Sequence, residues 1–153
     1  MPEADVDILL VEDSAEDAEL TLHSLRKNNV ASRIQWARDG EEGLDFLFCR
    51  GAFSWRSMQH PPKVVLLDLK LPKVDGLEVL RRIKEDARTK SIPVVVLTSS
   101  REEADVVRGY RNGANSYVQK PVEFEQFREA VRQLGLYWLV TNKPPEESTF
   151  TRG

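Results

Sequence analysis

The sequence has few of the residues on which disulfide scaffolds and histidine-ligated metal sites depend. Its 153 residues include one cysteine, Cys49, and two histidines, His23 and His60. A single cysteine cannot form an internal disulfide and is typical of a reducing compartment, and the two histidines do not have ligand spacing. The acidic start MPEADVD has neither the charge nor the apolar run of a signal peptide. We therefore expect a cytoplasmic protein.

Long apolar runs and a strong charge of one sign are also absent. No apolar stretch approaches the ~20 residues that a membrane span needs. The formal net charge of −3 gives no general attraction to nucleic acid or to anionic membranes. The 41% apolar and 31% charged fractions match a globular protein, and a chain of this length can bury roughly 70% of its unfolded surface. We expect one domain without a nucleic-acid or membrane partner.

Short apolar runs alternate along the chain with stripes of helical spacing. The continuous run from Val6 to Val11 predicts a strand buried on both faces. Further strands are predicted over residues 32–37, 64–67, 92–97 and 116–118. Helices are predicted after Ser14, Asp39 and Asp75, from Arg101, and along the apolar stripe from Phe124 to Trp138. The loop over residues 50–62 is longer than the usual ~4 to 6 residues.

This alternation predicts an α/β fold, a doubly wound parallel sheet of five strands with helices on both faces. We favour the strand order 2-1-3-4-5. Ligands in such folds bind at the carboxyl ends of the strands, near the point where the order reverses, here between strands one and three. The strand ends are therefore where functional residues are expected.

Polar side chains follow four of the predicted strands. Glu12 and Asp13 follow the first strand, Asp68 the third, Thr98 the fourth and Lys120 the fifth. Three carboxylates held close together repel each other and stay ionised only if a cation offsets the repulsion, and oxygen ligands suit a hard ion. The sequence therefore predicts a site for Mg²⁺ or Mn²⁺.

The same residues could support phosphoryl transfer to a carboxylate. Asp68 is the best nucleophile by position, and an aspartate can attack phosphorus to form an aspartyl phosphate. The Lys120 ammonium and the Thr98 hydroxyl would stabilise the charge on the phosphoryl oxygens.

Taken together, these motifs resemble the receiver domain of two-component response regulators, which has a flavodoxin-like fold. The resemblance covers about residues 7–139. The motifs that carry it are Glu12-Asp13-Ser14, Asp68-Leu69-Lys70-Leu71-Pro72 with Asp75-Gly76, Thr98-Ser99-Ser100, and Lys120-Pro121.

The resemblance implies a role for each matched residue. Asp68 would be phosphorylated by a sensor histidine kinase, and Glu12, Asp13, Asp68 and the Lys70 carbonyl would ligate Mg²⁺. The peptide bond between Lys120 and Pro121 would be cis. Thr98 and Tyr117 would form the switch, in which the hydroxyl moves to the phosphoryl group and the aromatic ring turns inward.

The end of the chain suggests a subfamily and an interface. We expect one receiver domain over residues 1–153, with a C-terminal extension over 140–153 and no output domain. The long loop and the apolar segment 136–140 resemble single-domain regulators paired with bacterial phytochromes. We predict a homodimer through the fourth helix, fifth strand, fifth helix and this extension, with interface residues Phe127, Leu136, Tyr137 and Trp138. Alternatively, Tyr137 and Trp138 cover the domain's own core.

Other functions of the same fold are less consistent with the sequence. An aspartate-dependent phosphohydrolase needs a second aspartate as proton donor where Lys70 stands. We therefore expect no enzymatic turnover beyond self-phosphorylation from a donor and autodephosphorylation. A flavodoxin-like cofactor binder would have a phosphate-binding loop after the first strand. In this sequence Glu12 and Asp13 stand there, and their carboxylates would repel a phosphate. A phosphorylation-independent adaptor with a receiver fold remains the alternative.

Overall fold

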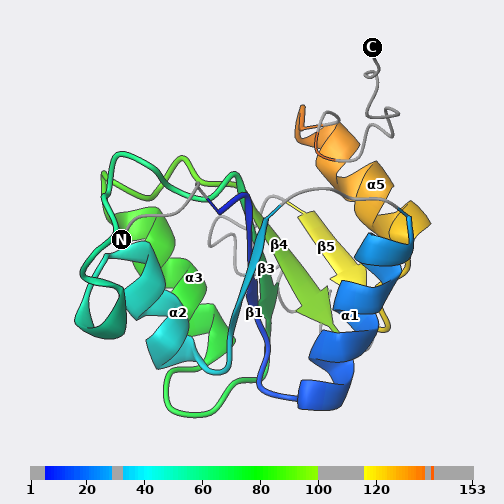
Figure 1. The fold of residues 1–153 in the computed structure, drawn as a ribbon, viewed down its shortest axis with the longest axis horizontal. Coiled ribbons are helices and arrows are strands. Elements are labelled where there is room, and N and C mark those ends of the chain that lie inside the picture. The colour runs from blue at the N-terminus through cyan, green and yellow to red at the C-terminus, as the bar shows by residue number, and fades with distance from the viewer. Residues whose placement is uncertain (1–5, 29–32, 100–115, 137–138, 140–153) are drawn as a thin grey trace.

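The computed structural model describes residues 6–28, 33–99, 116–136 and 139. A five-stranded parallel sheet has the order β2-β1-β3-β4-β5, as the sequence predicted (Figure 1). The strands are β1 (Ile8–Val11), β2 (Ile34–Ala37), β3 (Val64–Asp68), β4 (Val94–Thr98) and β5 (Ser116–Gln119). The helices are α1 (Ala15–Lys27), α2 (Gly40–Leu47), the short 3₁₀ helix η1 (Gly51–Phe53), α3 (Gly76–Glu85) and α5 (Phe124–Gln133). The helix predicted from Arg101 lies outside the described residues.

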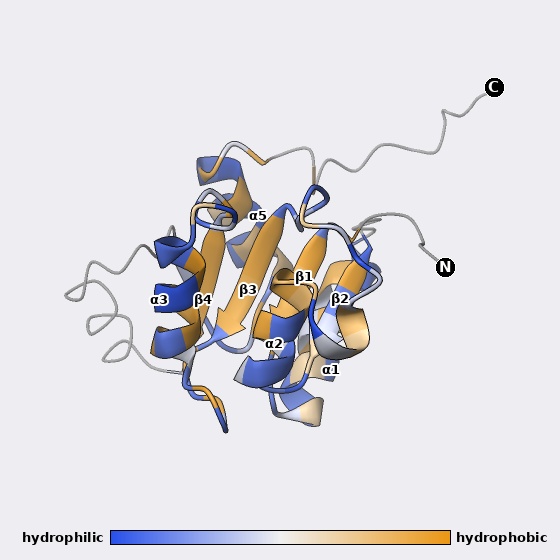
Figure 2. Cartoon of the chain, turned by 90° about the vertical axis from the view of Figure 1, so that its left-hand side faces the viewer, coloured by the Kyte–Doolittle hydropathy of each residue, from blue (hydrophilic) through white to orange (hydrophobic). Residues whose placement is uncertain are grey.

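Among the described helices, α1 and α5 cover one face of the sheet and α2 and α3 cover the other (Figure 1). Alternate residues of the strands point to opposite faces, so Ile8 and Leu10 pack toward α1 and α5 while Leu9 and Val11 pack toward α2 and α3. The central strands are apolar along their length, and the helices turn their polar sides outward (Figure 2). This burial on both faces explains the continuous apolar runs in the sequence.

Capping residues fix where the first two helices begin. The Ser14 hydroxyl accepts a hydrogen bond from the backbone N–H of Asp17 at 3.1 Å, and the Asp39 carboxylate accepts one from Glu42 at 2.7 Å. These contacts satisfy N–H groups that have no partner within the helix. Asp75 occupies the corresponding position before α3. The predicted helix starts are thus confirmed, and each lies just beyond the carboxyl end of a strand.

The long loop before β3 is packed against the C-terminal end of α2. The Arg56 guanidinium stacks on the ring of Phe46 at 3.7 Å and donates to the carbonyl oxygens of Phe46 and His60. These contacts and the short helix η1 order the segment, which the sequence predicted to lack regular structure.

Phe127 corrects one prediction about the surface. It was expected at a dimer interface, but its side chain is fully buried in the core between α5 and the sheet. A side chain at the centre of the apolar stripe of α5 faces the domain's own sheet and has no area left for a partner.

None of the helices in the described part of the chain combines the length and apolarity that a membrane span requires.

Candidate functional site

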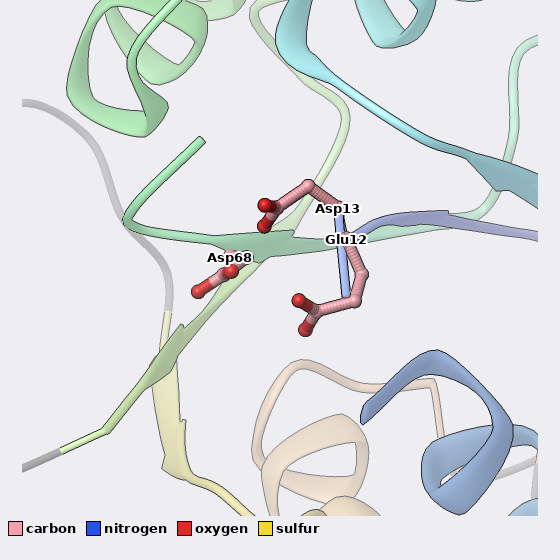
Figure 3. Close-up of side chains that lie close together, drawn as sticks. All are labelled: Glu12, Asp13 and Asp68. Atoms are coloured by element: carbon pink, nitrogen blue, oxygen red, sulfur yellow. The ribbon is translucent and has the colours of Figure 1, made fainter. Parts of the chain in front are cut away.

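Three carboxylates meet where β1 and β3 end. Glu12 and Asp13 directly follow β1, and Asp68 is the last residue of β3. The two strands are hydrogen-bonded neighbours, with Val11 opposite Leu67, so their ends lie at the same edge of the sheet. One oxygen from each of the three carboxylates lies within 4.8 Å of the others (Figure 3). We call Glu12, Asp13 and Asp68 the acid cluster.

The members of the acid cluster differ in their exposure to solvent. Glu12 is fully buried and Asp68 is 5% exposed, whereas Asp13 is exposed. The Glu12 carboxylate accepts a hydrogen bond from the backbone N–H of Ser14 at 3.2 Å. The site therefore opens to solvent beside Asp13, while Glu12 forms its inner wall.

Trp36 supports the backbone of the acid cluster from β2. Its indole N–H donates to the carbonyl oxygen of Glu12 at 2.7 Å. No pattern in the sequence predicts this contact, because an alternating edge strand does not show which of its side chains reaches the end of the next strand. This hydrogen bond ties the backbone that carries Glu12 and Asp13 to the neighbouring strand β2.

Burial raises the pKa of the inner two carboxyl groups, Glu12 and Asp68. The pKa of Glu12 is raised to about 7, first because burial penalises its charged form and second because the Asp68 carboxylate repels it; Lys120 offsets this in part. Burial also raises the pKa of Asp68, against the opposing effects of Lys120, Glu12 and the backbone of Lys70. Both shifts thus arise mainly from burial of carboxyl groups away from water.

Lys120 supplies positive charge to the acid cluster from the end of β5. Its Nζ lies 3.3 Å from Glu12 Oε1, 3.4 Å from Asp68 Oδ2 and 3.1 Å from Asp17 Oδ2. Burial alone would lower the pKa of Lys120, but the hydrogen bond with Asp17 and the charges of Asp68 and Glu12 outweigh burial and raise it. The bond between Lys120 and Pro121 is cis, as the resemblance implied. Asp17 was not predicted as a site residue, because its place in the first turn of α1 indicated only a role in helix capping.

Thr98 lies on β4, the strand next to the one that carries Asp68, and Tyr117 lies on β5, one strand further out. Thr98 ends β4 and is 1% exposed, and its neighbour Leu97 is paired with Asp68 across the sheet. The Thr98 carbonyl accepts the backbone N–H of Lys120 at 2.7 Å. Tyr117 is half-buried on β5, opposite Val96, against the core beneath α2 and α3. The two predicted switch residues are thus on adjacent strands, Thr98 at the edge that carries the acid cluster and Tyr117 two residues before the end of β5.

The acid cluster fits a hard divalent cation. Three carboxylates present only oxygen ligands, and one of them is exposed, which suits an ion that keeps part of its water shell. Burial penalises the charged forms of Glu12 and Asp68, and a bound divalent ion would offset that penalty. The residues present are therefore those expected for Mg²⁺ or Mn²⁺.

The predicted interface residues are described only in part. Leu136 is half-buried and packs against the core beneath α1 and α5, and Leu139 is 4% exposed in that core. Tyr137 and Trp138, like the extension over 140–153, lie outside the described residues.

Comparison with known proteins agrees with the fold and the acid cluster. The model of the response regulator receiver domain family matches residues 8–132. The probable methanogenesis regulatory protein FilR2 of Methanothrix harundinacea is 45% identical over 138 residues, which are 90% of this chain and 86% of FilR2. The response regulator Rcp1 of Synechocystis is 38% identical over 134 residues, covering 88% of this chain and 89% of Rcp1.

Solved structures show the same similarity in three dimensions. The bacteriophytochrome response regulator AtBRR superposes with a TM-score of 0.84 at 53% identity, covering 93% of this chain and all of AtBRR. Rcp1 in its Mn²⁺-bound form has a TM-score of 0.69, and the phosphorylated cyanobacterial phytochrome response regulator RcpA has one of 0.70. Both are 37% identical to this chain, and each alignment covers 93% of it and 99% of the other protein.

Proposed function

This chain belongs to the response regulator receiver domain family, and we propose that it receives a phosphoryl group on Asp68 from a sensor histidine kinase. The observation that carries the proposal is the convergence of the acid cluster and Lys120 at one edge of the sheet. Receiver domains act in signalling. We propose that the only reactions of this chain are its own phosphorylation from a donor and its own dephosphorylation, and that it acts in the cytoplasm. The adaptor alternative is not favoured, because an adaptor would not need the acid cluster.

The proposed transfer forms one bond and breaks another. A carboxylate oxygen of Asp68 attacks the phosphorus of the donor, the bond from phosphorus to the donor nitrogen breaks, and its electron pair stays with that nitrogen. Lys120, 3.4 Å from Asp68, is placed to move its ammonium to a phosphoryl oxygen, and the Thr98 hydroxyl is proposed to donate to another. Glu12, Asp13, Asp68 and the Lys70 carbonyl would hold Mg²⁺, which when bound supplies positive charge to the phosphoryl oxygens.

The kinase partner is proposed to be of the phytochrome type. Support comes from the similarity to AtBRR, Rcp1 and RcpA, and from the long loop before β3 on which the sequence resemblance rests. In an in vitro test, a purified bacteriophytochrome kinase carrying labelled phosphate on its histidine would transfer the label to this chain faster than an unrelated sensor kinase does. Equal rates from both kinases would count against a phytochrome partner.

We propose that the chain responds to phosphorylation by forming a dimer through α5 and the segment that follows it. The proposal is supported by Leu136, which follows α5 and is only half-buried, so that part of its apolar side chain stays accessible to a partner. We expect light scattering to show a larger dimer fraction after treatment with a small phosphodonor and Mg²⁺ than before it. A monomeric mass at high concentration in both states would contradict the dimer.

Intact mass spectrometry tests the phosphoacceptor. After incubation with a small phosphodonor and Mg²⁺, the wild-type chain should gain one phosphoryl group and Asp68→Asn should gain none. Asp75→Asn is a matched control, because Asp75 lies in the same strand-to-helix connection but outside the acid cluster, and its side chain makes no capping hydrogen bond that the substitution could remove. A phosphate adduct of equal yield in Asp68→Asn and wild type would refute the proposal.

A further inference from the structure

We propose that Asp17 is a positioning residue for Lys120. By holding the ammonium at the solvent side of the site, Asp17 limits how strongly Lys120 occupies the acid cluster and so keeps Glu12 and Asp68 available to a divalent cation. The inference rests on the proposed function, in which Glu12 and Asp68 are metal ligands. It adds a residue from α1 that neither binds the ion nor receives the phosphoryl group.

Asp17 makes the shortest of the three contacts with the ammonium. Its Oδ2 lies 3.1 Å from Lys120 Nζ, compared with 3.3 Å for Glu12 and 3.4 Å for Asp68. The Asp17 side chain is 40% exposed, whereas those of Glu12 and Asp68 are 0% and 8% exposed. Lys120 therefore stands between two inner carboxylates and one outer carboxylate.

The start of α1 fixes the position of Asp17. Its backbone N–H is bound by the Ser14 hydroxyl, and the next residue, Ala18, is fully buried in the core. A carboxylate in the first turn is also favoured by the positive end of the helix dipole. Because the backbone is held on both sides, the carboxylate has little freedom to follow Lys120 inward.

Lys120 and a divalent cation compete for the same carboxylates. Without the Asp17 carboxylate, the carboxylates that contact Lys120 in the described part of the chain would be Glu12 and Asp68, both in the acid cluster. The ammonium would then pair more fully with these two groups, and a cation would have to displace it. Loss of Asp17 is therefore expected to weaken metal binding through Lys120.

Binding of Mn²⁺ to the full chain tests the inference, with free Mn²⁺ measured by electron paramagnetic resonance. Asp17→Asn should raise the dissociation constant about threefold or more, the range expected for one partly exposed ion pair. Asp17→Glu should restore most of the affinity. Glu16→Gln removes the same charge from an exposed position in the same turn and should have a clearly smaller effect.

A double-mutant comparison separates positioning from a general effect of charge. In a Lys120→Gln background, Asp17→Asn should no longer change Mn²⁺ affinity, because the residue through which it acts is gone. An equal effect in both backgrounds, an effect no larger than that of Glu16→Gln, or no effect at all would overturn the inference. If Asp13→Asn and Asp68→Asn also left Mn²⁺ affinity unchanged, the metal assignment itself would fail; if they weakened it while Asp17→Asn did not, only the role of Asp17 would.

Discussion

Asp13 differs from the other two members of the acid cluster in its exposure, and this difference assigns it a separate role. Glu12 and Asp68 are buried beside Lys120, whereas Asp13 faces solvent at the mouth of the site. An incoming hydrated ion would meet Asp13 first. Because Asp13 is exposed, it can be changed with little effect on the packing of the core.

Replacement of Asp13 should therefore separate metal binding from folding. At a Mg²⁺ concentration about ten times its dissociation constant, binding should stabilise the wild-type chain by about 1.4 kcal/mol. Asp13→Asn should lose most of this stabilisation while keeping nearly the same melting temperature without Mg²⁺. Thermal melts with and without Mg²⁺ measure both quantities, with Asp75→Asn as the control. An equal Mg²⁺-dependent rise in Asp13→Asn and wild type would contradict the role of Asp13.

The connection from β3 to α3 is built around a very close approach at the first residue of α3. A Cβ atom added to Gly76 would lie 2.4 Å from the carbonyl oxygens of both Asp68 and Leu69. Backbone atoms cannot rotate away as a side chain can, so the end of β3 would have to shift. At Gly43 in α2, an added Cβ would lie 3.0 Å from a methyl group of Val11, a side-chain contact.

The two glycines should thus respond differently to alanine. Gly76→Ala should lower the free energy of unfolding by about 2 kcal/mol, within the range for overpacking, and should weaken Mg²⁺ binding because Asp68 moves with the backbone. Gly43→Ala should cost clearly less, because alanine also improves the helix interior by roughly 0.5 to 1 kcal/mol. Urea denaturation measures both variants. Equal destabilisation would argue against a special role for the connection at Gly76.

The elements themselves could be predicted from the sequence to different degrees. The start of α1 was predicted because Ser14 is a local capping signal, and the strand order followed from the strict alternation of elements. The beginning of β1 was expected at Val6 but lies at Ile8, because a strand extends only where a neighbouring strand pairs with it. Phe127 was wrongly predicted at a dimer interface, because an apolar stripe on a helix does not show whether the domain's own sheet or a second molecule covers it.

Within the site, the residues at strand ends were predictable and those that reach across from other elements were not. Glu12, Asp13, Asp68 and Lys120 converge because parallel strands end at one edge. The contacts of Trp36 with the Glu12 carbonyl and of Asp17 with Lys120 depend on side-chain reach between elements. Neither residue belongs to a local pattern that would have indicated these partners.

At the scale of the whole molecule, a change at Asp68 has to reach α5 and the segment after it if phosphorylation is to promote the proposed dimerisation. The path proposed here runs through Thr98 at the end of β4 and Tyr117 on β5, the strand that leads into α5. Thr98 is buried beside the strand that carries Asp68, so its hydroxyl can respond to a new phosphoryl group without a rearrangement of the sheet.

Removal of that hydroxyl should uncouple phosphorylation from the response. Thr98→Ala should still accept a phosphoryl group, as measured by intact mass, but its dimer fraction by light scattering should rise much less than that of the wild-type chain. Thr98→Ser keeps the hydroxyl and should retain the response. If Thr98→Ala dimerised on phosphorylation as fully as wild type, the switch assignment would be wrong.

The most direct measurement is the position of the phosphoryl group in the chain. Borohydride reduces an aspartyl phosphate to homoserine, which marks the modified residue permanently. After treatment with a small phosphodonor and Mg²⁺, reduction and peptide mapping should place homoserine at position 68, and omission of Mg²⁺ should largely abolish it. Homoserine at position 13 or at any other aspartate, with Asp68 unmodified, would contradict the central claim.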